Sequence, residues 1–156
     1  MERQTPLLVI DAAIAVKWFV PENDSRTALK LKDAHVKGEL SLIAPDLLIY
    51  ELGNALRYRK SLNKRDLQSS LESFFELDLA LIGPTSKSVS RATSLARALD
   101  LTVYDAAYLE LAESLGCKVV TSDRPFRDRV SQSRNINSSR IFLLEDYYKE
   151  SNEGYS

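Results

Sequence analysis

The chain has 156 residues, of which 44% are hydrophobic and 28% charged, and its formal net charge at pH 7 is −1. This composition is typical of a globular protein with its own core, and it excludes a polycation that binds nucleic acid through bulk charge. The single cysteine, Cys117, excludes an internal disulfide and predicts a reducing compartment, for which we expect the cytoplasm. No apolar run is long enough to cross a membrane, so we expect no membrane partner. The length fits one domain, which we expect over residues 1–156.

Short apolar strands alternate with amphipathic helices along the chain. The expected strands span residues 6–11, 39–45, 79–83, 117–123 and 141–146. The expected helices span residues 12–19, 23–38, 46–61, 63–78, 84–100 and 103–116. Asp46 is the expected N-cap of the third of these helices. After the sixth helix and the strand that follows it, we expect a short helical turn over 124–130, a loop over 131–140 and a polar tail over 147–156.

This alternation predicts a parallel sheet with helices on both faces, which is an α/β fold. We therefore expect a three-layer α/β/α sandwich with a mainly parallel central sheet and a core over about residues 7–145. In open sheets of this kind, sites form at the carboxyl ends of the strands. Residues at strand ends are consequently the first candidates for function.

The two strands that the sequence predicts to be buried each end in an acid. Asp11 closes the apolar run "LLVID", and Asp123 closes "KVVTSD". A core rarely keeps an unpaired carboxylate, because the transfer of a charge out of water is costly. These two acids are therefore expected either to have a structural partner or to belong to a site.

Two further acids lie in apolar stretches of predicted helices. Glu51 is found in "LLIYELGNAL" with Asn54 three residues later, so both project from one helix face. Asp105 opens the helix of "VYDAAYLELA", where Ala106 and Ala107 would let that turn pack close to the sheet.

Each acid also has a structural interpretation that involves no chemistry. Asp105 could stabilise the dipole of its helix, and Glu51 could face solvent beside Arg57 or Lys60. Asp123 could cap the turn that follows it, and Asp11 could pair with a buried arginine. Taken singly, these interpretations stay open.

Taken together, the four acids favour a metal site at one edge of the sheet. Clustered carboxylates repel one another unless a cation compensates them, and Mg²⁺ or Mn²⁺ prefers oxygen ligands. Such a site can activate water and stabilise a phosphoryl displacement without a protein nucleophile. The chain fits this chemistry because its only histidine, His35, lies far in sequence from Cys117 and no glycine-rich phosphate loop is present.

Four segments together resemble the PIN-domain nucleases, and most closely the VapC-type toxins of prokaryotic toxin–antitoxin pairs. They occur in the family's order between about residues 7 and 126: "LLVIDAAIAVKWFVPE", "APDLLIYELGNALR", "LTVYDAAYLELAESLG" and "CKVVTSDRPF". Each segment is weak by itself, whereas the ordered set is fairly specific. After residue 127 the sequence offers no motif of the family.

The resemblance implies an endoribonuclease that uses Mg²⁺ or Mn²⁺ and leaves a 5′-phosphate and a 3′-hydroxyl. It also implies a homodimer and a partner antitoxin that blocks the active-site groove. The family's catalytic and metal-binding acids fall on Asp11, Glu51, Asp105 and Asp123. Its threonine before the last acid falls on Thr121, and a polar position near the helix acid falls on Asn54.

Basic residues follow directly after two of the acids. They lie in "RYRKSLNKR" and "RPFRDR", and the candidates for RNA contact, together with Asn54, are Arg57, Arg59, Arg124 and Arg127. Such contacts hold phosphates without reading base sequence. The alternative interpretation is a solvated helix face, as runs of charge usually are.

Three functions are compatible with the sequence. The first is a ribonuclease toxin of a type II toxin–antitoxin system. The second is a housekeeping PIN nuclease that processes RNA, and the third is a non-catalytic module that binds RNA or protein and whose acids are structural.

Overall fold

The computed structural model describes residues 4–133 and 139–153, the last three as backbone only. Its centre is a five-stranded sheet with the order β3-β2-β1-β4-β5, in which every neighbouring pair is parallel. The strands are β1 Leu7–Ile10, β2 Ser41–Pro45, β3 Ala80–Ile82, β4 Lys118–Thr121 and β5 Ile141–Leu143. The predicted α/β class and parallel sheet are therefore confirmed.

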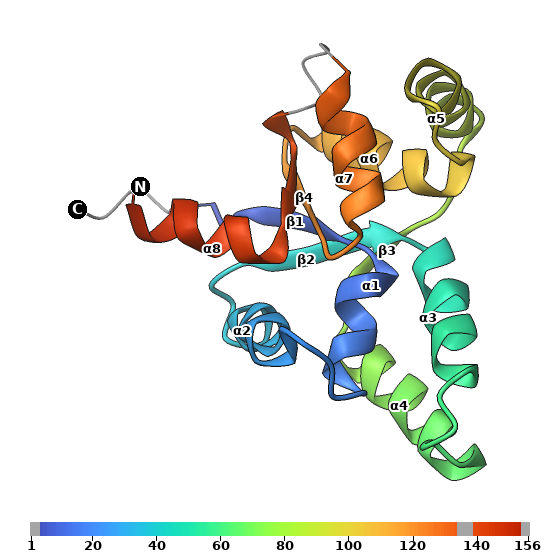
Figure 1. Ribbon diagram of the computed structural model, residues 1–156, viewed down its shortest axis with the longest axis vertical. Helices are drawn as coiled ribbons and strands as arrows, with labels where there is room; N and C mark the ends of the chain where they lie inside the picture. Colours follow the sequence, from blue (N-terminus) through green and yellow to red (C-terminus); the bar gives the residue numbers. More distant parts are fainter. Residues whose placement is uncertain (1–3, 134–138, 154–156) are drawn as a thin grey trace.

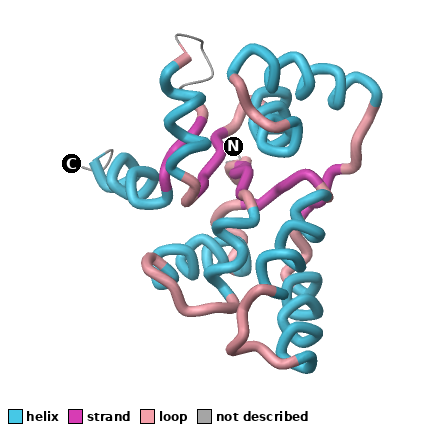
Figure 2. The backbone as a smooth tube through the Cα atoms, turned by 45° about the vertical axis from the view of Figure 1, so that its right-hand side comes forward, coloured by secondary structure: helices cyan, strands magenta, loops and turns pink. Residues whose placement is uncertain are grey.

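Helices cover both faces of the sheet, as the alternating pattern predicts. In Figure 1, α1 to α4 lie on one side of the strands and α5 to α7 on the other, and Figure 2 shows the strands running between these two layers. The helices are α1 Ala12–Ala15, the 3-10 helix Val16–Trp18, α2 Ser25–Val36, α3 Leu47–Arg57, α4 Lys64–Glu76, α5 Ser86–Leu99, α6 Val103–Leu115, α7 Arg124–Gln132 and α8 Leu144–Glu153. No helix within these described residues is long and apolar enough to span a membrane.

The core is built on the two central strands. In β1 the side chains of Val9 and Ile10 are fully buried, and in β4 the same holds for Val119 and Val120. Strands that are covered on both faces are continuous runs of branched apolar residues rather than alternating ones. This burial explains why the acid that follows β1 sits in apolar surroundings.

The chain changes direction across the sheet between β1 and β4. From β1 it proceeds outward through β2 and β3, and it then returns to the other side of β1 as β4. The register pairs Ile10 with Val120, so Asp11 and Thr121, one residue further on, are neighbours at the carboxyl edge. Crevices at such reversals are where open α/β sheets bind ligands.

Helix α6 is buried on most of its circumference. It contacts β1, β2 and β4 on one side and α5 on the other. Thr102 caps its first turn by accepting the N–H of Asp105 at 3.1 Å, and Gly116 ends it in the left-handed conformation with φ of 65°. Glycine adopts this conformation without steric cost, which is why the helix ends there.

Two local predictions at helix starts and ends need correction. Asp46 precedes α3 but its side chain does not accept a capping hydrogen bond, and its backbone N–H instead donates to the carbonyl of Ile82 at 3.0 Å. The predicted turn over 124–130 is a full helix, α7, that continues to Gln132 because Phe126 and Val130 bury one face. Of the predicted loop over 131–140, residues 134–138 lie outside the described part of the chain.

The predicted polar tail is wrong for most of its length. Residues from Leu144 to Glu153 form α8, and β5 ends at Leu143. Leu144 is buried, and Tyr147 and Tyr148 are half-buried against the core, with Lys30 of α2 lying over the ring of Tyr148 at 5.5 Å. Two adjacent aromatic rings give this polar segment enough apolar surface to dock, which its charged composition conceals.

Candidate active site

Asp11 and Thr121 form the centre of the site at the carboxyl edge of the sheet. Asp11 is 7% exposed, and its Oδ1 accepts the N–H of Ile14 at 3.3 Å, which caps α1. The hydroxyl of Thr121 donates to Asp11 Oδ2 and itself accepts the N–H of Asp123 at 2.9 Å. One buried threonine thus links the two strand-end acids.

Burial has a large effect on Asp11. Desolvation raises the pKa of Asp11 to about 7, the hydrogen bonds from Thr121 and Ile14 oppose this rise, and the negative charges of Asp123 and Glu51 add to it. No cation is among the causes of the shift, and the ion pairs of the described residues do not include Asp11. The alternative in which Asp11 pairs with a buried arginine is therefore wrong.

Glu51 faces the same region from the second turn of α3. Its side chain is half-buried, and its Oε1 accepts the hydroxyl of Tyr108, a residue of α6, at 2.7 Å. Burial raises the pKa of Glu51, the Tyr108 hydrogen bond lowers it, and the charge of Asp105 raises it again. Glu51 consequently does not project into solvent beside Arg57.

Asp105 and Asp123 lie at the starts of two helices. Asp105 is half-buried in the first turn of α6, and its pKa is raised by burial and by Asp123, against smaller effects of Thr102 and Arg129. Asp123 accepts the N–H of Phe126 at 3.1 Å and thereby caps α7. The capping interpretation of Asp123 is correct, and it is compatible with a place in the acidic cluster because helix N-termini stabilise negative charge.

The four acids form one electrostatic group. The negative charges of Asp123 and Glu51 raise the pKa of Asp11. The charge of Asp105 raises the pKa of Glu51, and that of Asp123 raises the pKa of Asp105. As placed, no three His, Cys, Asp or Glu side chains within the described ranges make a ready set of metal ligands.

The donor chemistry of this group nevertheless fits a hard divalent cation. All four acids supply carboxylate oxygens, and for Asp11, Glu51 and Asp105 burial and repulsion by neighbouring acids oppose the negative charge, which a cation would relieve. The Oγ of Ser122, beside Asp123, is buried without a hydrogen-bond partner among the described residues. The residues that could hold such an ion are Asp11, Glu51, Asp105 and Asp123.

Tyr108 belongs to the candidate site through its contact with Glu51, and the sequence-based predictions do not include it. Its side chain is 1% exposed, and burial together with Glu51, Asp11 and Asp105 raises its pKa, so the hydroxyl keeps its proton. A signal was present, because Tyr108 follows Asp105 by three residues and lies on the same helix face. A buried tyrosine usually needs an acceptor for its hydroxyl, and a nearby acid is one.

The basic side chains at and just after the end of α3 differ in their partners. Asn54 is exposed and accepts the Nε of Arg57 at 2.8 Å, while the Arg57 guanidinium lies 4.2 Å from the ring centre of Tyr58. Arg59 instead forms an ion pair with Glu22, a contact across 37 residues of sequence. Arg57 has no carboxylate partner among the described residues.

The arginines of α7 are all engaged by acids. Arg124 pairs with Glu145, and Arg127 pairs with Asp128 at 2.8 Å and with Asp146 at 3.6 Å. Glu145 and Asp146 belong to the first turn of α8, although the sequence predicts them as the end of a strand over 141–146. No local pattern in the sequence indicates these ion pairs.

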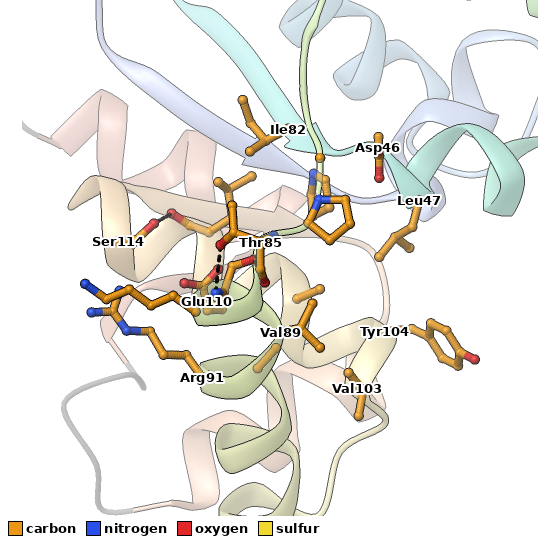
Figure 3. A pocket seen from close by; sticks show the side chains of 18 residues that line it. Asp46, Leu47, Ile82, Thr85, Val89, Arg91, Val103, Tyr104, Glu110 and Ser114 are labelled. Carbon is orange, nitrogen blue, oxygen red and sulfur yellow. Dashed lines mark hydrogen bonds between the residues drawn. The ribbon is translucent and has the colours of Figure 1, made fainter.

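A separate cavity of about 450 Å³ lies between the end of β3, the start of α5 and one side of α6. Figure 3 shows Ile82, Val89, Val103 and Tyr104 around it, with Glu110 and Arg91 nearby. None of the four clustered acids lines this cavity. It is therefore a feature distinct from the carboxylate group.

The comparison with protein-family models matches residues 8–130 to the PIN domain. Among curated proteins, Ribonuclease VapC3 of Pyrobaculum aerophilum is 35% identical over 126 residues, which are 78% of this chain and 93% of the relative. All four acids lie inside the matched range.

Solved structures show the same fold at lower sequence identity. PAE2754 from Pyrobaculum aerophilum superposes with a TM-score of 0.63 at 21% identity, covering 94% of this chain and 95% of that one. VapBC2 from Rickettsia felis, bound to a promoter DNA fragment, superposes with a TM-score of 0.62 at 17% sequence identity. The match covers 88% of this chain and 98% of that one. VapC20 of Mycobacterium tuberculosis, a toxin that cleaves the sarcin–ricin loop, superposes with a TM-score of 0.62 at 13% sequence identity. The match covers 78% of this chain and 93% of that one. The matched domain and the VapC3 relative establish that the chain belongs to the PIN-domain family, among its VapC-type ribonucleases.

Proposed function

We propose that this chain is an endoribonuclease that requires Mg²⁺ or Mn²⁺ and acts in the cytoplasm as the toxin of a type II toxin–antitoxin system. The observation that carries the proposal is the electrostatic group of Asp11, Glu51, Asp105 and Asp123 at the reversal of the sheet. The similarity to Ribonuclease VapC3 supports RNA as the substrate.

The four carboxylates would hold the divalent ion, and a bound ion supplies the charge that activates water and stabilises the phosphate during hydrolysis. Thr121 would keep Asp11 and Asp123 in fixed relative positions through its two hydrogen bonds. The apolar walls around Asp11 would exclude bulk water from one side of the site.

Arg57 is the strongest candidate for phosphate contact among the four predicted arginines. Arg59, Arg124 and Arg127 already bind carboxylates, whereas the guanidinium of Arg57 contacts only Asn54 and Tyr58 among the described residues. An arginine without an acidic partner can neutralise a phosphate without breaking an ion pair. Arg59, Arg124, Arg127 and Asn54 are proposed as weaker contacts.

We propose two protein partners, an antitoxin and a second copy of this chain. The VapBC2 structure of Rickettsia felis is a precedent for the fold in such a pair. For the second copy, the face around the cavity exposes Ile82, Val89 and Val103. The cavity lining also carries both signs of charge, from Asp46, Glu110, Lys87 and Arg91. A twofold contact brings a patch against itself, so mixed charge permits a match that a single sign would prevent.

Dimerisation through this face predicts that Val89→Lys yields a monomer in light scattering at concentrations where the wild type is dimeric. The introduced charge would replace an apolar side chain in the contact between the two copies, and its removal from water is costly. Val36→Lys, at an exposed position of α2, is the control and should stay dimeric. A dimeric Val89→Lys would show that the contact lies elsewhere.

The nuclease proposal is tested with purified chain, single-stranded RNA and Mn²⁺. Wild type should cleave, EDTA should stop cleavage, and Asp11→Asn should lower the rate by at least about a hundredfold while its circular dichroism is unchanged. Asp33→Asn, an exposed position of α2, is the matched control. Full activity of Asp11→Asn would exclude the proposed site.

The toxin role requires a separate experiment in a bacterial host. Expression of the wild type should arrest growth, and co-expression of the neighbouring gene should restore it. Asp11→Asn should be harmless in both conditions. If the wild type cleaves RNA in vitro but does not arrest growth, a housekeeping nuclease is favoured.

A further inference from the structure

The hydroxyl of Tyr108 joins two helices that are far apart in sequence. It donates to Glu51 Oε1 at 2.7 Å across 57 residues, from α6 to α3. The ring is 1% exposed, so its position is fixed by core packing rather than by the hydrogen bond. The hydroxyl is therefore a rigid donor presented to a half-buried acid.

The same hydroxyl lies within the acidic group. It is hydrogen-bonded to Glu51, and the charges of Glu51, Asp11 and Asp105 all act on it. Thr121 holds Asp11 in a corresponding way, with a buried hydroxyl that donates to one carboxylate oxygen. Two of the four acids are thus held by neutral hydroxyl donors on other elements.

We propose that Tyr108 is a positioning residue that acts through Glu51 on the divalent ion, an inference that rests on the proposed function. The hydrogen bond occupies Oε1 and restrains the carboxylate, so Glu51 would be held in a fixed position to bind a divalent ion. The described residues provide no hydrogen bond to Oε2. Donors that orient a ligand in this way typically change metal affinity by about 10–100-fold when removed.

The decisive variant is Tyr108→Phe, which removes the hydroxyl and keeps the ring that packs in the core. Glu51 is half-buried and can be solvated when the donor is lost, so the variant should fold. We expect the Kd for Mn²⁺, measured by calorimetry without RNA, to rise by about tenfold or more. Tyr50→Phe is the matched control, because Tyr50 is 83% exposed on α3.

Cleavage provides a second measurement. The Mn²⁺ concentration that gives half the maximal rate should rise by the same factor as the Kd, while the rate at saturating Mn²⁺ returns to within a few-fold of wild type. A role in packing alone would lower the melting temperature and leave both Mn²⁺ values unchanged, which would overturn the inference.

A double-mutant cycle tests whether Tyr108 acts through Glu51. Glu51→Asp keeps the charge but withdraws the carboxylate from the hydroxyl, so it should weaken Mn²⁺ binding. Tyr108→Phe should cause no further loss in that background, because the contact is already gone. Additive losses would overturn the inference.

The outcomes separate the two proposals. If wild type binds no Mn²⁺, the metal-dependent nuclease and the role of Tyr108 both fail. If wild type binds Mn²⁺, Asp11→Asn abolishes binding and Tyr108→Phe binds normally, then only the role of Tyr108 fails.

Discussion

Asp11 shows how a single residue can be identified before its partners are known. A carboxylate at the end of an apolar strand is costly unless something compensates it. The structure places it 7% exposed and hydrogen-bonded to Thr121 and Ile14, and the charges of Asp123 and Glu51 act on it. The apolar flanks that drew attention to Asp11 also raise its pKa.

The raised pKa of Asp11 predicts a pH-dependent stability in metal-free buffer. The folded chain binds this proton more tightly than the unfolded chain, so the free energy of unfolding falls as pH rises from about 4 to about 7. Asp11→Asn removes that loss and should stabilise the chain at pH 8, by up to about 4 kcal/mol. Urea unfolding with EDTA at pH 4 and pH 8 measures the difference.

The comparison at pH 4 is the internal control, because wild-type Asp11 is protonated in the fold there. Asp33→Asn should have little effect at either pH, since Asp33 is exposed. An equal effect of Asp11→Asn at both pH values would contradict the raised pKa.

Thr121 predicts a contrast between two substitutions. Thr121→Val keeps the buried shape but removes the hydroxyl that bonds Asp11 and Asp123, so cleavage should fall by about tenfold or more. Thr121→Ser keeps the hydroxyl and should retain most activity. RNA cleavage at fixed Mn²⁺ measures both, and equal rates for the two variants would show that the hydroxyl is dispensable.

At the scale of elements, α6 carries both an acid and the donor for another acid. Its small residues were expected to let the first turn pack close to the sheet. Ala106 is fully buried, but it packs with Ala92 and Ala96 of α5. The small side chains therefore hold α5 against α6, and the position of Asp105 depends on that contact.

Ala106→Leu should disturb this contact. The larger side chain has no space between the helices, so the free energy of unfolding should fall by about 1–3 kcal/mol. Cleavage should fall as well, because the adjacent Asp105 moves with the turn. Chemical unfolding measures the first effect, and Ala98→Leu, at an exposed position of α5, is the control.

Element boundaries could be predicted where local patterns decide them. The run of branched residues identifies β1, and Gly116 with its left-handed conformation marks the end of α6. Helix α8 was missed because its stability comes from Tyr147 and Tyr148 packing against distant residues, and no pattern within the segment reveals that. Local sequence reports propensity, whereas docking depends on what the rest of the fold offers.

At the scale of the whole molecule, charge is nearly balanced, with a net value of −1. RNA binding must therefore depend on local cations that are not already neutralised. Within the described residues Arg57 has no carboxylate partner, whereas Arg124 is paired with Glu145. The fold, and not the number of arginines, decides which of them are available.

The contrast between paired and unpaired arginines predicts a difference in the salt dependence of RNA binding. Arg57→Ala should lower the affinity for single-stranded RNA and reduce the slope of log K against log salt by about 0.7, the value for one phosphate contact. Arg124→Ala should change the slope less. Fluorescence anisotropy at several salt concentrations, with catalysis removed by Asp11→Asn, gives both slopes. Equal slopes for the two variants would contradict the assignment.

The sequence by itself determined the α/β class, the acids that follow the strands and the resemblance that points to the candidate site residues. These follow from local burial patterns and from motifs that keep their order along the chain. Only the tertiary structure decided which residues meet. It placed β4 beside β1, brought Tyr108 to Glu51, and paired Arg59, Arg124 and Arg127 with distant acids. Such pairings depend on strand order and helix docking, which are set by long-range packing rather than by any local pattern.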